Sequence, residues 1–297
     1  MKGIVWLASF PKSGNTWLRL LLANYFDADG TGIALDRFQF GRLASSRLIF
    51  DEWSVVDSSE LTDAEADVMR PDMYRAMAAA SPEPIFLKTH QAWSRNLRNE
   101  PLFPADATAA AIYAVRNPLD VAVSMAPHMN ISLSQAVALM CNDTAAIGTL
   151  DPEIRMRFPE RLMSWSGHVR SWLDESNLPL VLVRYEDLKV DPVGVFGRIV
   201  AAVDASPDAA RIARAVEFTA FDRLQAQERE LGFDERRSTT QLFFRGGRVG
   251  DGRRSLSDAD KQRLYDEHGS TMERLGYSLC GEVSYNSARV GPGARPS

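Results

Sequence analysis

The first 26 residues constrain the fold of this chain more than any other segment. Residues 3–10 form a short apolar run, which is typical of a buried strand in a parallel sheet. Residues 11–16 read Pro-Lys-Ser-Gly-Asn-Thr and end this run with polar and turn-forming residues. Residues 16–26 then place apolar side chains at helical spacing on one face. The segment therefore predicts a strand, a glycine-containing loop and a helix.

Three later apolar runs resemble the first in length and setting. Residues 85–87, 110–115 and 180–183 are each predicted as short strands. Pro118 follows the second of these runs and suits the first turn of a helix, which residues 119–125 continue. Strands that alternate with helices favour an α/β fold with a central, mainly parallel sheet flanked by helices.

The rest of the chain gives weaker structural signals. Residues 132–142 and 159–176 have the apolar spacing of helices, and the second carries a tryptophan-rich face that core packing explains. Residues 225–258 are polar and rich in arginine, and we predict a mobile segment there. No fixed-period repeat is present. We expect a single domain over residues 1–283 and a disordered tail over residues 284–297.

Composition excludes several classes of protein. The chain has 297 residues, of which 45% are hydrophobic and 25% are charged, as in ordinary globular proteins. Its 34 basic and 39 acidic residues give a net charge of -5, which argues against a protein that coats nucleic acid. Cys141 and Cys280 are too few for a disulfide framework, and no cysteine–histidine cluster suggests a metal site. No apolar stretch is long enough to span a membrane, and we expect a cytoplasmic protein.

The loop at residues 11–17 has the chemistry of a phosphate-binding site. The start of a helix offers unpaired N–H groups and the positive end of the helix dipole. Gly14 allows the backbone to approach a ligand closely, and Lys12 adds a positive charge. The loop lacks the G-x-x-x-x-G-K-[ST] spacing of nucleoside-triphosphate-binding loops. Taken alone, it fits either a phosphate site or simple helix capping.

This loop resembles the one with which PAPS-dependent sulfotransferases hold the 5′ end of 3′-phosphoadenosine 5′-phosphosulfate (PAPS). Further segments resemble motifs of the same family and occur in the family's order. They are residues 87–90 (Leu-Lys-Thr-His), 115–124 (Val-Arg-Asn-Pro-Leu-Asp-Val-Ala-Val-Ser), 165–172, 184–188 (Arg-Tyr-Glu-Asp-Leu), 218–221 and 243–251. Each motif is weak by itself, but their common order and their spread over most of the chain make the set specific.

The resemblance implies one donor site built from several loops. The loop at residues 12–17 would bind the 5′ end of PAPS, while Arg116 and Ser124 would bind its 3′-phosphate, for which a planar guanidinium is well suited. The implied donor-binding residues are Lys12, Ser13, Gly14, Asn15, Thr16, Trp17, Arg116, Ser124, Tyr185, Thr219, Phe221, Arg245, Gly246 and Gly247. For the three aromatic residues in this set, contact with the nucleotide and core packing both explain the residue type.

The late segment at residues 243–251, which would close over the 3′-phosphate, departs from the family pattern. Gly246 stands where the family usually has a lysine, and Gly252 stands where a tryptophan is often found. Nearby arginines are candidates for supplying the missing positive charge. They are Arg248, Arg253 and Arg254.

His90 is the predicted general base, because imidazole titrates near neutral pH and can accept a proton from a hydroxyl or an amine. The resemblance implies in-line transfer of the sulfuryl group of PAPS to an acceptor, which releases adenosine 3′,5′-bisphosphate (PAP). Lys12, Lys88 and the loop N–H groups would stabilise the charge that develops on the leaving 5′-phosphate. We expect that no metal ion is needed.

Two other functions stay open at this point. A P-loop-type phosphoryl-transfer enzyme would need the missing loop spacing and a metal-binding aspartate. An inactive nucleotide-binding module would keep Lys12 and Arg116 but would have no need of His90. Preference for PAP over ATP with Mg²⁺ would argue against the first alternative, and a sulfated product would argue against the second.

The acceptor is predicted to be a small molecule, bound by loops within residues 27–81, 126–158 and 225–248. Aromatic and apolar side chains in or near such loops suggest an apolar or aromatic acceptor, but core packing explains them equally well. These side chains are Phe38, Phe40, Phe50, Trp53, Trp93 and Met129.

Overall fold

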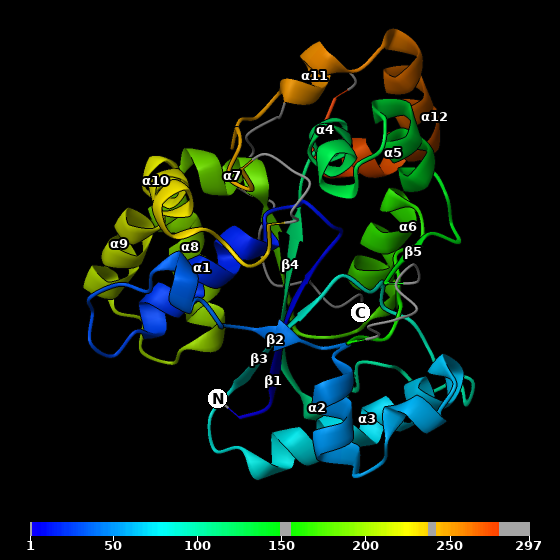
Figure 1. Ribbon diagram of the computed structural model, residues 1–297, viewed down its shortest axis with the longest axis vertical. Coiled ribbons are helices and arrows are strands. Elements are labelled where there is room, and N and C mark those ends of the chain that lie inside the picture. Colours follow the sequence, from blue (N-terminus) through cyan, green and yellow to red (C-terminus); the bar gives the residue numbers. More distant parts are fainter. Residues whose placement is uncertain (1, 149–155, 237–241, 279–297) are drawn as a thin grey trace, which may run out of the picture.

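A five-stranded parallel sheet forms the centre of the protein (Figure 1). The computed structural model describes residues 2–148, 156–236 and 242–278. The strands lie in the order β2-β3-β1-β4-β7, and each neighbouring pair runs parallel. Their bounds are Ile4–Ser9 for β1, Arg42–Leu43 for β2, Ile85–Thr89 for β3, Thr108–Val115 for β4 and Leu180–Arg184 for β7. The α/β fold expected from the sequence is confirmed.

Side-chain alternation along β1 explains why helices cover both faces of the sheet. Trp6 and Ala8 point into one hydrophobic cluster, whereas Val5 and Leu7 point into another. Both clusters exclude water from the strand, as expected for a central strand of a parallel sheet. On the Val5 face lie α1 (Asn15–Phe26), α8 (Pro192–Val203) and α9 (Ala209–Phe218). On the Trp6 face lie α2 (Arg47–Ser54), α3 (Asp63–Ala80), α4 (Pro118–Met129), α5 (Leu133–Met140), α6 (Trp165–Arg170) and α12 (Asp258–Arg274).

Shorter elements complete the described part of the chain. The remaining helices are α7 (Tyr185–Val190), α10 (Phe221–Leu231) and α11 (Asp251–Ser255). Two-residue strands β5 (Ala146–Ile147) and β6 (Glu160–Arg161) pair antiparallel, and single helical turns cover Leu35–Arg37, Ser58–Glu60, Ala105–Ala107 and Ser171–Glu175. Within the described ranges, no helix is both long enough and apolar enough to cross a membrane.

The structure corrects two of the predicted segments. The helix expected over residues 159–176 begins later than predicted, because the Ser164 hydroxyl accepts a hydrogen bond from the Gly167 N–H and starts α6 at Trp165. The π-helical turn Ser171–Glu175 then continues α6. Within residues 225–258, α10 and α11 cover parts that we predicted to be mobile, and α10 is anchored by its buried Leu224. The predicted tail lies outside the described residues.

The parallel arrangement places the ends of β1, β3 and β4 at one edge of the sheet (Figure 1). Ligands of open α/β sheets bind at this carboxyl edge, beside the loops that follow the strands. Here β1 leads into the loop that contains Lys12, β3 ends one residue before His90, and β4 ends one residue before Arg116. Three motifs that are far apart in sequence therefore meet at one place.

Candidate active site

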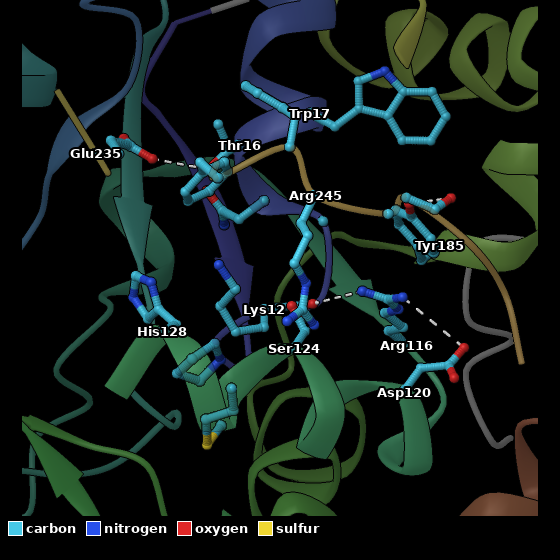
Figure 2. Close-up of a pocket in the computed structure, with 18 of the residues that line it drawn as sticks. Lys12, Thr16, Trp17, Arg116, Asp120, Ser124, His128, Tyr185, Glu235 and Arg245 are labelled. Carbon is cyan, nitrogen blue, oxygen red and sulfur yellow. Dashed lines mark hydrogen bonds and ion pairs between the residues drawn. The ribbon is translucent and has the colours of Figure 1, made fainter. Parts of the chain in front are cut away.

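A cavity of about 650 Å³ opens at this edge of the sheet (Figure 2). Of the residues predicted to form the site, those that line the cavity are Lys12, Gly14, Asn15, Thr16, Trp17, Lys88, His90, Arg116, Ser124, Tyr185, Thr219, Phe221, Arg245, Gly246 and Gly247. Ser13 differs from them, since its side chain is fully buried and its hydroxyl has no hydrogen-bond partner in the described part of the chain. The structure therefore brings almost the whole predicted set into one space.

Backbone geometry shapes the first loop for an anion. Lys12 has a φ of 67° and Gly14 has a φ of 100°, so the chain turns sharply before α1 begins at Asn15. A Cβ atom at Gly14 would lie 2.8 Å from Cδ2 of Tyr185, which leaves no room for a larger residue. Asn15 donates to the Leu7 carbonyl at 2.9 Å and thereby ties the loop to β1. The first N–H groups of α1 are left available for a phosphate.

Arg116 joins the first loop to the late segment. Its guanidinium donates to the carbonyl of Arg248 at 2.9 Å and lies 3.5 Å from the carbonyl of Lys12. It also stacks on the Tyr185 ring at 4.4 Å and lies 3.9 Å from the Asp120 carboxylate (Figure 2). The side chain is only 11% exposed, so its charge acts in an environment where water screens it weakly. A positive group is thus fixed where both loops can reach a phosphate.

Asp120 fixes the end of the late segment beside Arg116. Its carboxylate accepts hydrogen bonds from the N–H groups of Gly250 at 2.8 Å and Gly252 at 2.7 Å. A Cβ atom at Gly252 would lie 2.3 Å from the carbonyl carbon of Leu119, so a side chain cannot be placed there without moving α4. Close packing against α4 therefore explains why position 252 is a glycine.

The late segment also rests on α10. The Glu228 carboxylate accepts from the N–H groups of Phe243 at 2.5 Å and Phe244 at 2.8 Å. Gly247 has a φ of 56°, and a Cβ there would lie 2.4 Å from the Phe221 ring. Arg245 reaches across the cavity toward the Val123 carbonyl, at 3.4 Å (Figure 2).

One cationic side chain that lines the cavity was not selected by the sequence analysis. Arg248, Arg253 and Arg254 do not line the cavity in the described structure, and Arg254 is exposed in an ion pair with Asp251. Lys189 lines the cavity instead, with its ammonium 5.6 Å from the Trp17 ring and 5.5 Å from the Phe221 ring. Its place four residues after Tyr185 on α7 was the available signal.

Aromatic side chains form the wall beside Lys189. Trp17 donates through Nε1 to the carbonyl of Thr219 at 3.1 Å and meets the Tyr185 ring edge-on at 5.8 Å. Tyr185 donates through its hydroxyl to the Gly247 carbonyl at 3.2 Å. Trp17 packs on Tyr185 and Phe221 packs on Phe244, and all three residues of the predicted set also line the cavity, so both sequence interpretations apply to them. A flat aromatic base fits such a wall.

His90 is held as a neutral imidazole with one available nitrogen. Its Nδ1 lies 2.9 Å from the carbonyl oxygen of Ser9, which can only accept, so Nδ1 carries the proton and Nε2 carries the lone pair. Burial, with a further contribution from the charge of Lys88, holds the pKa of His90 well below its usual value of 6.5. The ring is therefore in the basic form at neutral pH.

Neighbouring side chains fix the backbone of His90. The Glu160 carboxylate accepts from the His90 N–H at 2.8 Å, and His168 lies with Nε2 3.0 Å from the His90 carbonyl oxygen. The Tyr113 hydroxyl lies 2.7 Å from the other nitrogen of His168. Burial lowers the pKa of His168 to about 4, so this ring stays neutral while it holds its neighbour. Trp172 donates through Nε1 to the carbonyl of Gln91, the residue after His90, and also helps to fix this part of the backbone.

We predict that the imidazole of His90 titrates well below pH 6.5. Its pKa is lowered by burial and by the charge of Lys88, so protonation should occur in more acidic solution than for an ordinary histidine. An NMR titration of the His90 ring, assigned by comparison with the His90→Asn variant, measures this directly. A midpoint at or above pH 6.5 would show that the burial inferred here is wrong.

Lys88 and Glu235 both line the cavity and form an ion pair. The Lys88 ammonium lies 3.6 Å from the Glu235 carboxylate, and burial lowers the pKa of Lys88 although Glu235 opposes this shift. Glu235 also accepts from the Thr16 hydroxyl at 2.8 Å (Figure 2). No local sequence motif marked Glu235, because its role depends on contacts with residues more than 140 positions away.

The other end of the cavity is lined mainly by α4 and its surroundings. Of the candidate acceptor-contacting residues, Met129 lines this space, whereas Phe50 and Trp93 belong to the buried core. Trp53 packs against the same core, and Phe38 and Phe40 pack in two other hydrophobic clusters. The lining residues at this end that the sequence did not select are Met125, Pro127, His128, Asn130, Ile147, Arg157 and Phe243. Within the described ranges, no group of three or more His, Cys, Asp or Glu residues is arranged to hold a metal ion.

Comparison with known proteins identifies relatives across nearly the whole chain. The sulfotransferase domain family matches residues 2–276. The chain is 25% identical to sulfotransferase 1A1 of Canis lupus familiaris over 211 residues, which are 67% of this chain and 65% of that protein. It is 23% identical to human sulfotransferase 1C2 over 288 residues, which are 93% of this chain and 86% of that protein. Cytosolic sulfotransferase 10 of Arabidopsis thaliana is 24% identical over 259 residues, which are 82% and 71% of the two chains.

Solved structures share the fold at lower identity. A crystal structure of mouse sulfotransferase SULT7A1 complexed with PAP has a TM-score of 0.58 and 20% identity, and the match covers 95% of this chain and 87% of that one. Retinol dehydratase in complex with androsterone and PAP has a TM-score of 0.58 and 18% identity, covering 91% and 80%. These likenesses support the fold, while the family match over residues 2–276 carries the assignment. The chain belongs to the sulfotransferase domain family.

Proposed function

We propose that this protein transfers the sulfuryl group of PAPS to a hydroxyl or amine of a small-molecule acceptor. The observation that carries the proposal is the single cavity in which the Lys12 loop, Arg116 and the basic nitrogen of His90 meet. The names of the relatives support the reaction class, and the structural neighbours are described as complexes with PAP. We also propose a cytoplasmic location, which the name of the Arabidopsis relative supports.

The donor carries phosphate groups at two separated positions, and the cavity offers two separated positive regions. The start of α1, with Lys12 and Thr16, would hold the 5′ end of PAPS through N–H groups and charge. Arg116 and Arg245, with the Ser124 hydroxyl, would hold the 3′-phosphate. The adenine would lie against the aromatic wall that Trp17, Tyr185 and Phe221 form with Lys189. These proposed contacts are the ones that the resemblance of the individual sequence motifs implies.

The proposed reaction is one in-line displacement at sulfur. The acceptor oxygen or nitrogen forms a bond to sulfur while the bond between sulfur and the bridging phosphate oxygen breaks. His90 accepts the acceptor's proton at Nε2, and the electron pair of the broken bond stays on the 5′-phosphate of PAP. Lys12 and Lys88 stabilise that developing charge, and preorganised donors of this kind commonly contribute about 3 kcal/mol each.

The acceptor end of the cavity favours a molecule with an apolar body. Met125, Met129, Ile147 and Phe243 supply the apolar contacts, and His90 lies where a hydroxyl would be activated. Retinol dehydratase, a structural neighbour, is described in complex with androsterone and, in another crystal, with retinol. An apolar or aromatic alcohol, phenol or amine is therefore the proposed acceptor class.

The structure disfavours the two alternatives raised by the sequence. A phosphoryl-transfer enzyme of the P-loop kind needs an aspartate for a metal ion, but Asp120 is engaged with Gly250 and Gly252. Asp251, which also lines the cavity, is paired with Arg254. An inactive module has no use for a histidine whose tautomer and backbone are fixed by several neighbours, as they are for His90. Both observations favour a working sulfotransferase site.

We expect PAP to raise the thermal unfolding midpoint and ATP with Mg²⁺ to leave it nearly unchanged. Incubation with ³⁵S-labelled PAPS and a panel of phenols, aliphatic alcohols, amines and sterols should then label at least one acceptor. Selective stabilisation by ATP with Mg²⁺ would instead support the phosphoryl-transfer alternative. Stabilisation by PAP without labelling of any acceptor would support the inactive module.

A further inference from the structure

The carboxylate of Glu235 is bound by groups that the proposed function assigns to the donor. Thr16 donates its hydroxyl proton to one carboxylate oxygen at 2.8 Å, and the Lys88 ammonium lies 3.6 Å from the other. Arg19 forms an ion pair with that second oxygen. An internal anion therefore lies at the 5′ end of the proposed donor site, beside the start of α1 (Figure 2).

The environment keeps Glu235 ionised. Burial favours its neutral form, but the charges of Lys88 and Arg19 outweigh this effect and lower the pKa of Glu235 to about 2. The side chain is 26% exposed, so it faces the cavity and is accessible from it. The Glu235 carboxylate therefore carries a full negative charge in the folded protein at neutral pH.

Arg19 is a fixed partner rather than a mobile one. Its Nε and Nη2 atoms donate to the Phe40 carbonyl at 2.9 and 2.7 Å, and the residue is 5% exposed. Only its Nη1 reaches Glu235. Glu235 lies two residues after Phe233, which is buried among neighbouring aromatic rings. A change of the Glu235 side-chain rotamer would release Thr16 and Lys88 while Arg19 and Phe233 stay in place.

We propose that Glu235 is an internal competitor of the donor: its carboxylate binds Thr16 and Lys88 when PAPS is absent and is displaced when PAPS binds. The proposal rests on the proposed function, because it takes Thr16 and Lys88 as ligands of the 5′-phosphosulfate. A carboxylate and a phosphosulfate cannot share these donors, since like charges at contact distance repel strongly in a partly buried site. Glu235 thus lowers donor affinity and holds the two groups in place before binding.

Replacement of Glu235 by glutamine tests the proposal through the sign of the effect. Glu235→Gln keeps the shape but removes the charge, so PAP should bind about 10-fold more tightly, as expected when one repulsive charge near the 5′-phosphate is removed. Asp234→Asn is the matched control, because it makes the same charge change at the exposed neighbouring residue. The control should change the Kd of PAP by less than about twofold.

Isothermal titration with PAP, after circular dichroism has confirmed folding, gives the decisive comparison. Unchanged or weaker binding to Glu235→Gln would overturn the proposal and assign Glu235 a purely structural role. If that variant does not fold, Glu235→Ala is the alternative, because it removes the charge and the contact with Thr16 together. It should also bind PAP more tightly than the unmodified protein does, and weaker binding would overturn the proposal. Failure of PAP to bind the unmodified protein would instead refute the proposed function on which the inference rests.

Discussion

Replacement of His90 by asparagine is expected to lower kcat by about 10²- to 10⁴-fold, the range typical for loss of a general base. The asparagine amide can still donate to the Ser9 carbonyl, as Nδ1 of His90 does, but it has no basic nitrogen at the position of Nε2. The variant therefore removes the base and keeps the hydrogen bond that positions it. Steady-state kinetics with a labelled acceptor, at saturating PAPS and acceptor, measure the loss.

Binding of PAP supplies the control for this variant. His90 lies at the end of β3, whereas the proposed contacts of PAP come from the start of α1, Arg116 and the late segment. The Kd of PAP should therefore change by less than about threefold, since no charge is removed from the nucleotide site. A variant that retains its kcat would show that His90 is not the base. Equal losses of kcat and PAP affinity would indicate that the substitution has disrupted the fold of the site.

Replacement of Arg116 by alanine is expected to weaken PAP binding about 100-fold, or about 3 kcal/mol, because two charge-assisted hydrogen bonds to one phosphate are lost. Adenosine 5′-phosphate lacks the 3′-phosphate, so its affinity should fall much less. The preference of the unmodified protein for PAP should therefore nearly disappear in the variant. Isothermal titration of both nucleotides against both proteins measures this preference.

Arg254→Ala is the matched control for Arg116→Ala. Arg254 carries the same charge and lies on α11, shortly after the late segment, but its side chain is 67% exposed and does not line the cavity. Its loss should leave the affinity for PAP nearly unchanged, because solvent and salt screen an exposed charge. If Arg116→Ala weakens both nucleotides equally, the residue acts by holding the Lys12 and Arg248 carbonyls rather than by binding the 3′-phosphate.

Local periodicity was sufficient to predict most of the sheet. The strands β1, β3, β4 and β7 are short apolar runs, and burial on both faces demands such composition. The strand β2 has only two residues and pairs with β3 through Arg42 and Leu43, so its sequence carries no periodic signal. The helix that we predicted over residues 159–176 starts later than expected, because a single capping serine at position 164 decides where α6 begins.

The candidate site was predictable where its residues follow strands directly. Lys12, His90 and Arg116 come just after β1, β3 and β4, so their convergence follows from the parallel sheet itself. Glu235 reaches the cavity only through tertiary packing, and no spacing in the sequence brings it near Thr16. Lys189 had one local signal, its place four residues after Tyr185 on α7, but its position beside Trp17 depends on how α7 packs against α1. The close approach of Gly252 to Leu119 was equally invisible, since it depends on how α11 packs against α4.

The central claim is that one PAP molecule spans the cavity from the Lys12 loop to Arg116. A crystal structure of the protein grown with PAP tests this most directly. We predict the 5′-phosphate at the start of α1, within hydrogen-bond distance of Thr16, and the 3′-phosphate within hydrogen-bond distance of Arg116 in the same nucleotide. A nucleotide bound outside the cavity, or bound inside it with its 3′-phosphate remote from Arg116, would contradict the claim.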